Sequence, residues 1–159
     1  MPRMSDEVQI RRGETTDHAA LADIFHESVR DGATLYSGAQ RMAWSPAPPE
    51  MADWSAKLSA QTVFVAEAGG KPVGFLTLMP DGDVDLAYIH PSHKGKGLFR
   101  RLYNPLEAQA REAGLKALTT HASLHAHPAF LAVGFKVTEE EHVARNGETF
   151  QRFAMRKML

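Results

Sequence analysis

The amino-acid sequence predicts an α/β domain in which helices cover both faces of one mixed, mostly antiparallel sheet. Three observations support this fold class. Three consecutive runs rich in Val, Phe and Leu, joined by short turns, indicate an antiparallel meander. A strand, a glycine-rich loop, a helix and a strand then follow in the order of a parallel βαβ crossover. Asn146 and Gly147 form a strong signal for a β-hairpin near the end of the chain.

The first elements are a strand over residues 7–12 and an amphipathic helix that starts near Asp17. We expect Thr15 or Thr16 to cap this helix and Gly32 to end it. The apolar residues of the helix recur at helical spacing on one face: Leu21, Ile24, Phe25 and Val29.

Residues 33–50 are predicted to be a loop, because the three prolines near its end remove amide donors and hold the chain extended. A second helix follows, with Met51, Trp54 and Leu58 on its buried side. Trp44 and Trp54 flank the prolines. We expect them to wall a pocket for a small ligand or, in the case of Trp54, to pack in the core.

The remaining elements carry the meander and the crossover. The strands of the meander cover residues 62–67, 73–79 and 84–90. A glycine-rich loop then leads into a helix that Gly114 ends and in which Pro105 predicts a kink. The chain closes with a strand over residues 116–122, a short helix over 128–133, and hairpin strands over 135–143 and 149–157.

The composition restricts the possible functions. The 159 residues predict a single domain over residues 1–159, and the net charge of −1 gives no global attraction to nucleic acid or anionic lipid. The absence of cysteine excludes disulfides, thiolate metal sites and cysteine nucleophiles. We find no secretory signal and no apolar run of the ~20 residues that a membrane span needs. We therefore expect a cytoplasmic protein with no nucleic-acid or membrane partner.

Residues 93–101, HKGKGLFRR, carry the clearest chemical signal. Two glycines lie where a strand passes into a helix, so the unpaired amides of the first helical turn can approach an anion. Lys94, Lys96, Arg100 and Arg101 add positive charge, which favours a pyrophosphate. The loop lacks the ending of a Walker A motif and the three glycines of a dinucleotide-binding fingerprint. For the loop alone, a lysine-rich turn that binds nothing is the alternative.

The order of elements and this loop together resemble the GNAT superfamily of acyl-CoA-dependent N-acyltransferases, over essentially the whole chain. Residues 94–99, KGKGLF, are similar to the superfamily motif Gln/Arg-x-x-Gly-x-Gly/Ala, and Tyr88, Ile89, His90 and Pro91 precede it in the usual way. Two further segments resemble a subgroup of small bacterial members, residues 122–135 and 155–159. The sequence departs from the motif at two positions, where it has Lys94 and Phe99.

The resemblance implies that acetyl-CoA is the co-substrate. Its pyrophosphate would lie against the loop backbone, and its pantetheine arm would pair with the preceding strand. The acetyl carbonyl would then lie near the amide of Ile89 or His90, an oxyanion-type donor. Phe99 fits if its side chain turns away from the phosphates into the core. The residues implied to contact the coenzyme are Tyr88, Ile89, His90, Lys94, Gly95, Lys96, Gly97, Leu98, Phe99 and Phe130.

Direct attack by an amine requires an acceptor for the ammonium proton and a donor for the departing thiolate. The superfamily's usual donor is a tyrosine, but Phe130 occupies its position. Either Ser123 or another residue substitutes, or the thiolate leaves unassisted, or the protein is a non-catalytic acyl-CoA-binding module. Asp85 is the expected base, directly or through water, with hydrogen bonding to neighbouring backbone as its alternative role. His90 is the second candidate base.

His121, His125 and His127 raise the alternative of a metal-dependent hydrolase. Because they straddle a strand end and a helix start and no cysteine is available, we expect no metal. The sequence therefore predicts an acetyl-CoA-dependent N-acetyltransferase that acts on a small-molecule or peptide amine. A homodimer is a possible assembly.

Overall fold

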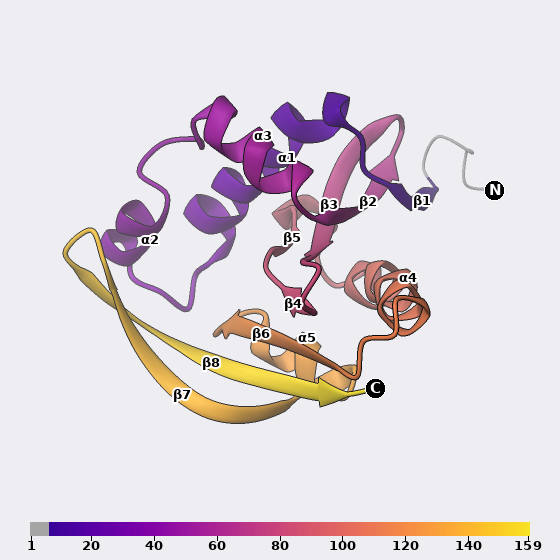
Figure 1. Cartoon of the computed structure of the whole chain (residues 1–159). Helices are drawn as coiled ribbons and strands as arrows, with labels where there is room; N and C mark the ends of the chain where they lie inside the picture. The colour runs from indigo at the N-terminus through magenta and orange to yellow at the C-terminus, as the bar shows by residue number, and fades with distance from the viewer. Residues whose placement is uncertain (1–6) are drawn as a thin grey trace.

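The structure is a computed structural model that describes residues 7–159. It confirms the mixed α/β class, but the strands form two four-stranded sheets rather than the single sheet predicted from the sequence. Figure 1 shows the long C-terminal hairpin curving past the end of the first sheet toward the helices of the N-terminal half. The space between the two sheets is therefore bordered by segments that are far apart in the sequence.

The first sheet is antiparallel throughout and has the strand order β1-β2-β3-β5. Its strands are β1 (Val8–Arg12), β2 (Thr62–Ala68), β3 (Lys71–Leu78) and β5 (Ala87–Ile89). Side chains alternate between its faces, so Val65 and Phe75 belong to one core cluster while Phe64 and Leu76 belong to the other. Three helices cover these faces, α1 (His18–Glu27) and α3 (Met51–Ser59) on one and α4 (Leu98–Glu112) on the other.

The second sheet has the order β4-β6-β8-β7. Its short strand β4 runs parallel to β6, which confirms the predicted crossover, and the other pairs are antiparallel. The turn between β7 and β8 contains Asn146 and Gly147, both with positive φ, as the hairpin prediction requires. Its elements are β4 (Asp83–Val84), β6 (Ala117–Ser123), α5 (His127–Ala132), β7 (Lys136–Arg145) and β8 (Glu148–Met158).

A β-bulge divides the predicted strand over residues 84–90 between the two sheets. Leu78 alone faces Val84 and Asp85, and such a two-against-one arrangement bends a strand. The hydrogen bonds on either side of the bulge run from Thr77 N–H to Leu86 O at 2.9 Å and from Met79 N–H to Asp83 O at 2.8 Å. Beyond the bulge β4 pairs with β6, whereas β5 remains paired with β3.

The Thr77 side chain holds this bulge in place. Leu86 N–H donates to Thr77 Oγ1 at 3.0 Å, instead of to the main-chain carbonyl that a regular ladder would use. Thr77 is fully buried, so water cannot replace its oxygen as the acceptor.

The start of α1 differs from the sequence prediction. A 3-10 turn, η2 (Thr15–Asp17), precedes the helix, and the cap is not Thr15 or Thr16. The Asp17 carboxylate instead accepts the Glu14 N–H at 2.7 Å, because a carboxylate reaches this amide and favours the positive end of the helix. The helix continues as a π-helical turn, η3 (Ser28–Gly32), which ends at Gly32 as predicted.

A helix, α2 (Gly38–Trp44), lies inside the segment predicted to be a loop. Gln40 N–H donates to Ser37 Oγ at 3.0 Å and Ser37 N–H donates to Gln40 Oε1 at 2.8 Å, which together form a capping box. Two further helices bear on the sequence predictions. Met51 was predicted to lie on the buried side of its helix, but it is 42% exposed because it is the first residue of α3. Helix α4 continues through Pro105 to its end.

We expect Thr77→Val to destabilise the fold, because the substitution leaves the Leu86 N–H buried without an acceptor. Such a loss costs about 1–3 kcal/mol in the free energy of unfolding. Urea denaturation measures the change. Thr62→Val on the neighbouring strand is the control, since Thr62 makes no side-chain hydrogen bond within residues 7–159. Equal stability of the two variants would contradict the assigned role of Thr77.

Candidate functional site

Two adjoining cavities open where β5 and β6 separate. The first, of about 400 Å³, is lined by β5, the glycine-rich loop and the start of α5. The second, of about 480 Å³, is lined by the bulge, the helices of the N-terminal half and the β7–β8 hairpin. Trp44, Tyr88 and Ser123 line both cavities and therefore mark their junction.

The glycine-rich loop has the backbone that an anion site requires. Gly95 and Gly97 have φ values of +76° and +73°, and the space where a Cβ would lie is open at both positions. Gly97 precedes α4, whose first turn leaves its amides without partners inside the helix. Arg101 is the first residue whose amide is used by the helix, since its N–H donates a hydrogen bond to Gly97 O at 3.4 Å. The amides before Arg101 and the positive end of this helix of 15 residues are available to a phosphate.

Most residues predicted to contact a coenzyme lie around the first cavity. Those lining it are Tyr88, Ile89, Lys94, Gly95, Gly97, Leu98 and Phe99. The structure does not bring three others to its wall: His90, Lys96 and Phe130.

The Lys94 ammonium donates to Gly32 O at 3.4 Å, and burial lowers its pKa. This contact joins the glycine-rich loop to the end of η3. A hydrogen bond within the protein therefore holds the Lys94 side chain even without a bound anion.

The rings of Phe99 and Phe130 pack against each other with centroids 5.0 Å apart. The Phe99 side chain is partly buried against the core, the orientation that a bulky residue in this loop needs. Phe130 is only 1% exposed and also packs on Phe135, at 5.0 Å. Because Phe130 has no polar atom and lies in the core, no proton donor is present at this position.

The backbone pairing of β5 distinguishes the two amides proposed for the acetyl carbonyl. His90 N–H donates to Val73 O at 2.8 Å, so this amide is occupied by β3. Neighbouring residues of an antiparallel strand point their amides in opposite directions. The Ile89 amide therefore faces the free edge of the first sheet, as does the Ile89 carbonyl, which accepts the Ser28 hydroxyl at 3.3 Å.

The imidazole of His90 is directed away from both cavities. Its Nε2 lies 2.7 Å from Glu27 Oε2, and its Nδ1 lies 2.7 Å from Ser92 Oγ. The second candidate base is therefore held in a local network with Glu27 and Ser92.

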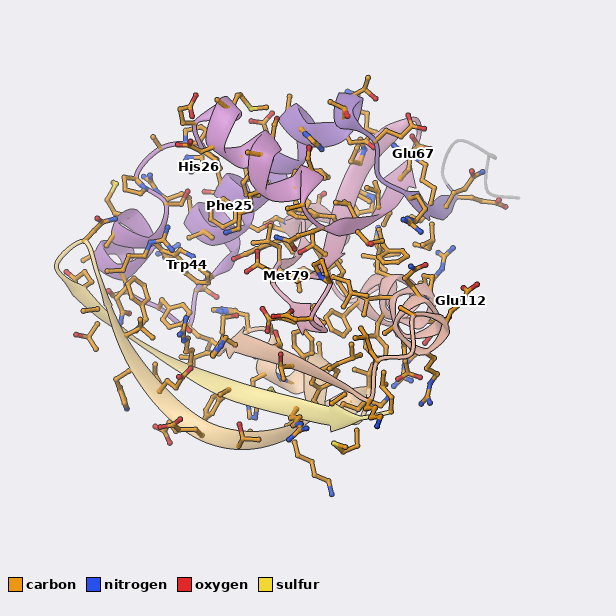
Figure 2. The ribbon with its side chains drawn as sticks, viewed as in Figure 1. Phe25, His26, Trp44, Glu67, Met79 and Glu112 are labelled. Carbon is orange, nitrogen blue, oxygen red and sulfur yellow. The ribbon has the colours of Figure 1, made fainter. Side chains whose placement is uncertain are left out.

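Aromatic side chains wall the second cavity. Tyr88 packs edge-on against Phe25, at 5.0 Å, and Trp44 lies 6.0 Å from Phe150. Figure 2 shows Phe25 on α1 and Trp44 near the C-terminal hairpin. Trp54 fulfils both expected roles, since it lines this cavity and is only 5% exposed, with its indole N–H donating to His18 O at 2.9 Å.

Asp85 lies at the bulge and lines the second cavity only. Its Oδ2 accepts a hydrogen bond from Gln61 Nε2 at 2.8 Å and lies 3.6 Å from Lys57 Nζ. Its partners are side chains, not the neighbouring backbone that the alternative role would require.

Ser123 lies at the end of β6, where its Oγ accepts the Ala126 N–H at 3.1 Å. The hydroxyl proton is not used in this bond. Ser123 can therefore still donate toward the junction of the cavities.

Charged residues that the sequence analysis missed also line the second cavity: Asp83, Arg145 and Arg152. Asp83 accepts the Thr119 hydroxyl at 2.9 Å, and burial raises its pKa. Arg152 pairs with Glu141 at 3.1 Å. Within residues 7–159, Arg145 has neither an ion pair nor a side-chain hydrogen bond. No local motif marks these residues, because only the fold brings the hairpin to the bulge.

The three histidines considered as metal ligands have separate partners. His121 Nδ1 lies 2.8 Å from Glu141 Oε1, His125 Nε2 accepts the Leu35 N–H at 3.0 Å, and His127 stacks on Phe153 at 4.2 Å. Across residues 7–159 the structure groups no three metal-ligating side chains. The same part of the chain has no helix long and apolar enough to cross a membrane.

Comparison with known proteins identifies relatives of this fold. Residues 35–157 match the family model described as an acetyltransferase (GNAT) domain. A GCN5-related N-acetyltransferase from Rhodopseudomonas palustris is 33% identical, superposes with a TM-score of 0.88, and aligns over 95% of each chain. The L-amino acid N-acyltransferase MnaT of Escherichia coli K12 is 28% identical over 150-odd aligned positions that cover 84% of this chain and 82% of MnaT.

A third relative shows the fold with a ligand. The putative acetyltransferase yncA from Salmonella typhimurium was solved with its cofactor acetyl-CoA. It is 22% identical, has a TM-score of 0.74, and covers 96% of this chain and 94% of its own.

Proposed function

Because the chain belongs to the GNAT family of N-acetyltransferases, we propose that it acetylates the primary amine of a small amino-carboxylate, by direct attack on acetyl-CoA in a ternary complex. The observation that carries this proposal is the pair of cavities that meet at Trp44, Tyr88 and Ser123. One cavity has the features of a coenzyme site and the other of an acceptor site. The two substrates can therefore be bound at once, with their reacting atoms at the junction.

In the proposed complex the coenzyme occupies the first cavity. The amides from Gly95 to Phe99 would hold the pyrophosphate, and the free edge of β5 would accept the pantetheine arm. The relative yncA, which holds acetyl-CoA, supports this choice of ligand. Ile89 N–H, which β3 does not use, would donate to the thioester oxygen as negative charge develops on it.

Asp85 is the proposed base and Ser123 the proposed donor to the departing sulfur. The acceptor ammonium gives up one proton to Asp85, and its nitrogen forms the bond to the acetyl carbon. The carbon–sulfur bond then breaks with its electron pair on sulfur, while Ser123 passes the second nitrogen proton on to that sulfur. The unperturbed thiol pKa near 8.5 makes this thiolate a tolerable leaving group. A modest contribution from Ser123 therefore suffices in the absence of the tyrosine that Phe130 replaces.

The acceptor is proposed to carry a carboxylate that Arg145 binds. The cavity of about 480 Å³ has the size of a small-molecule site, and its aromatic walls suit an apolar side chain. Arg145 offers a guanidinium that no group within residues 7–159 neutralises. MnaT, a relative named as an L-amino acid N-acyltransferase, supports an acceptor of this class.

We expect Gly97→Val to abolish coenzyme binding, because a side chain at positive φ strains the loop and blocks the approach of the phosphates. The measurement is the shift in Tm on adding acetyl-CoA or free coenzyme A, with ATP as ligand control. At about 100 times its Kd the coenzyme should raise the Tm of the unmodified protein by about 5–10 °C.

Gly114→Val is the matched variant, because it places the same strain at the opposite end of α4. The Gly114→Val variant should retain the Tm shift with acetyl-CoA. A normal shift in Gly97→Val would show that the loop does not bind the phosphates.

We expect Asp85→Asn to lower kcat by about 10²- to 10⁴-fold while the Tm shift with acetyl-CoA persists. Asparagine still accepts the hydrogen bond from Gln61 but cannot take up the ammonium proton. Thiol release from acetyl-CoA with a panel of L-amino acids measures the rate. In the same assay, Ser123→Ala tests whether Ser123 donates a proton to the departing sulfur. If Asp83→Asn loses the rate and Asp85→Asn keeps it, the base has been misassigned.

We expect Arg145→Gln to raise the KM of amino-carboxylates by about ten- to a hundredfold, since it removes a charged hydrogen bond. The KM of the corresponding amino amides should change little. Arg152→Gln is the matched comparison, because Glu141 already holds that guanidinium. Equal effects of Arg145→Gln on acids and amides would rule out carboxylate recognition by this residue.

A further inference from the structure

We propose that the Tyr88 hydroxyl relays the proton of the attacking amine to Asp85; this inference rests on the proposed function. The need for a relay follows from the positions of the groups. The amine must attack where the cavities meet, whereas Asp85 lines the second cavity only. A group at the junction is therefore placed to connect the amine to the carboxylate.

Tyr88 is the junction residue suited to that role. Trp44 has only an N–H donor, and Ser123 is already the proposed donor to the departing sulfur. The phenol oxygen of Tyr88 can accept a hydrogen bond and donate one at the same time. Tyr88 and Asp85 both line the second cavity. Burial raises the pKa of the Tyr88 hydroxyl, the charge of Arg145 opposes that rise, and the charge of Asp85 adds to it.

The Tyr88 hydroxyl is available for this contact. Of the three tyrosines, Tyr36 donates to Gln151 O at 2.7 Å and Tyr103 donates to Glu107 Oε1 at 2.6 Å. The Tyr88 hydroxyl makes no hydrogen bond to any group within residues 7–159, and Tyr88 lines both cavities. Its ring is held by aromatic neighbours, with centroids 5.0 Å from Phe25, 5.9 Å from Phe75 and 6.5 Å from Trp44.

The relay is balanced in protons. The ammonium N–H proton passes to the Tyr88 oxygen as the Tyr88 proton passes, through a water molecule in the second cavity, to the Asp85 carboxylate. The freed lone pair on nitrogen then attacks the acetyl carbon. Burial raises the pKa of Tyr88, so the phenol is protonated before the step, and the concerted transfer leaves it protonated afterwards. No phenolate forms, and a high pKa is therefore compatible with the role.

Tyr88→Phe is the direct test. It removes a hydroxyl without a protein partner and keeps the aromatic packing, so the Tm and the Tm shift with acetyl-CoA should be unchanged. The kcat for an L-amino acid should fall about 10²-fold or more, as expected for Asp85→Asn. Tyr103→Phe is the control for loss of a tyrosine hydroxyl, since it lies outside both cavities.

An aminooxy acid separates a relay from a merely structural role. Its nitrogen is unprotonated at neutral pH, so it needs no base before attack. The loss in kcat for Tyr88→Phe and for Asp85→Asn should therefore shrink to less than about tenfold with this acceptor. With the L-amino acid, the double variant should be no slower than the slower single variant, because both residues serve one proton path.

The outcomes distinguish the inference from the function on which it rests. Absence of thiol release by the unmodified protein would remove the proposed function. Turnover by the unmodified protein with an unchanged kcat in Tyr88→Phe would overturn the relay alone. Additive losses of kcat in the double variant would also overturn the relay. The same holds for a loss of kcat in Tyr88→Phe that is equally large for the amino acid and the aminooxy acid.

Discussion

One extra residue opposite Leu78 separates the two sheets, and both cavities depend on that separation. In a regular ladder, β4 and β5 would be one strand paired with β3 along its whole length. The bulge, held by the buried Thr77 oxygen, sends β4 to β6 and leaves β5 with a free edge. The same distortion places Asp85 in the acceptor cavity. A stabilising contact and the position of a reactive group thus have one structural origin.

The proposed coenzyme is an anion, whereas the protein has no basic overall charge. Its net charge is −1, so attraction must come from local groups. The open backbone around Gly95 and Gly97 and the start of α4 supply donors that do not titrate. The second cavity differs, since its polar groups are side chains from several elements. In the proposed complex, coenzyme binding would therefore depend on backbone geometry, and acceptor binding on side-chain identity.

The sequence was sufficient where local rules decide the structure. Glycine at a strand–helix junction and Asn146 with Gly147 at a turn each act within a few residues, and both predictions were confirmed. Helix α2 was also readable from its capping box, but the prolines after it outweighed that signal. The separation of the two sheets could not be predicted from the sequence. It depends on the Thr77 hydroxyl accepting the Leu86 N–H in place of a main-chain carbonyl, and such a contact leaves no sequence pattern. Arg145 was missed for a related reason, since only the fold brings it to the wall of the second cavity.

The hairpin turn has a consequence for how this protein can diversify. Asn146 Nδ2 donates to Ala43 O at 2.7 Å, which attaches the turn to α2 beside the acceptor cavity. Most of the first cavity comes from two compact stretches of chain, whereas the second cavity is assembled from many. Exchanging the turn would reshape the second cavity, the proposed acceptor side, and leave the glycine-rich loop intact. In evolution or in directed engineering, a change of acceptor is therefore a smaller step than a change of donor.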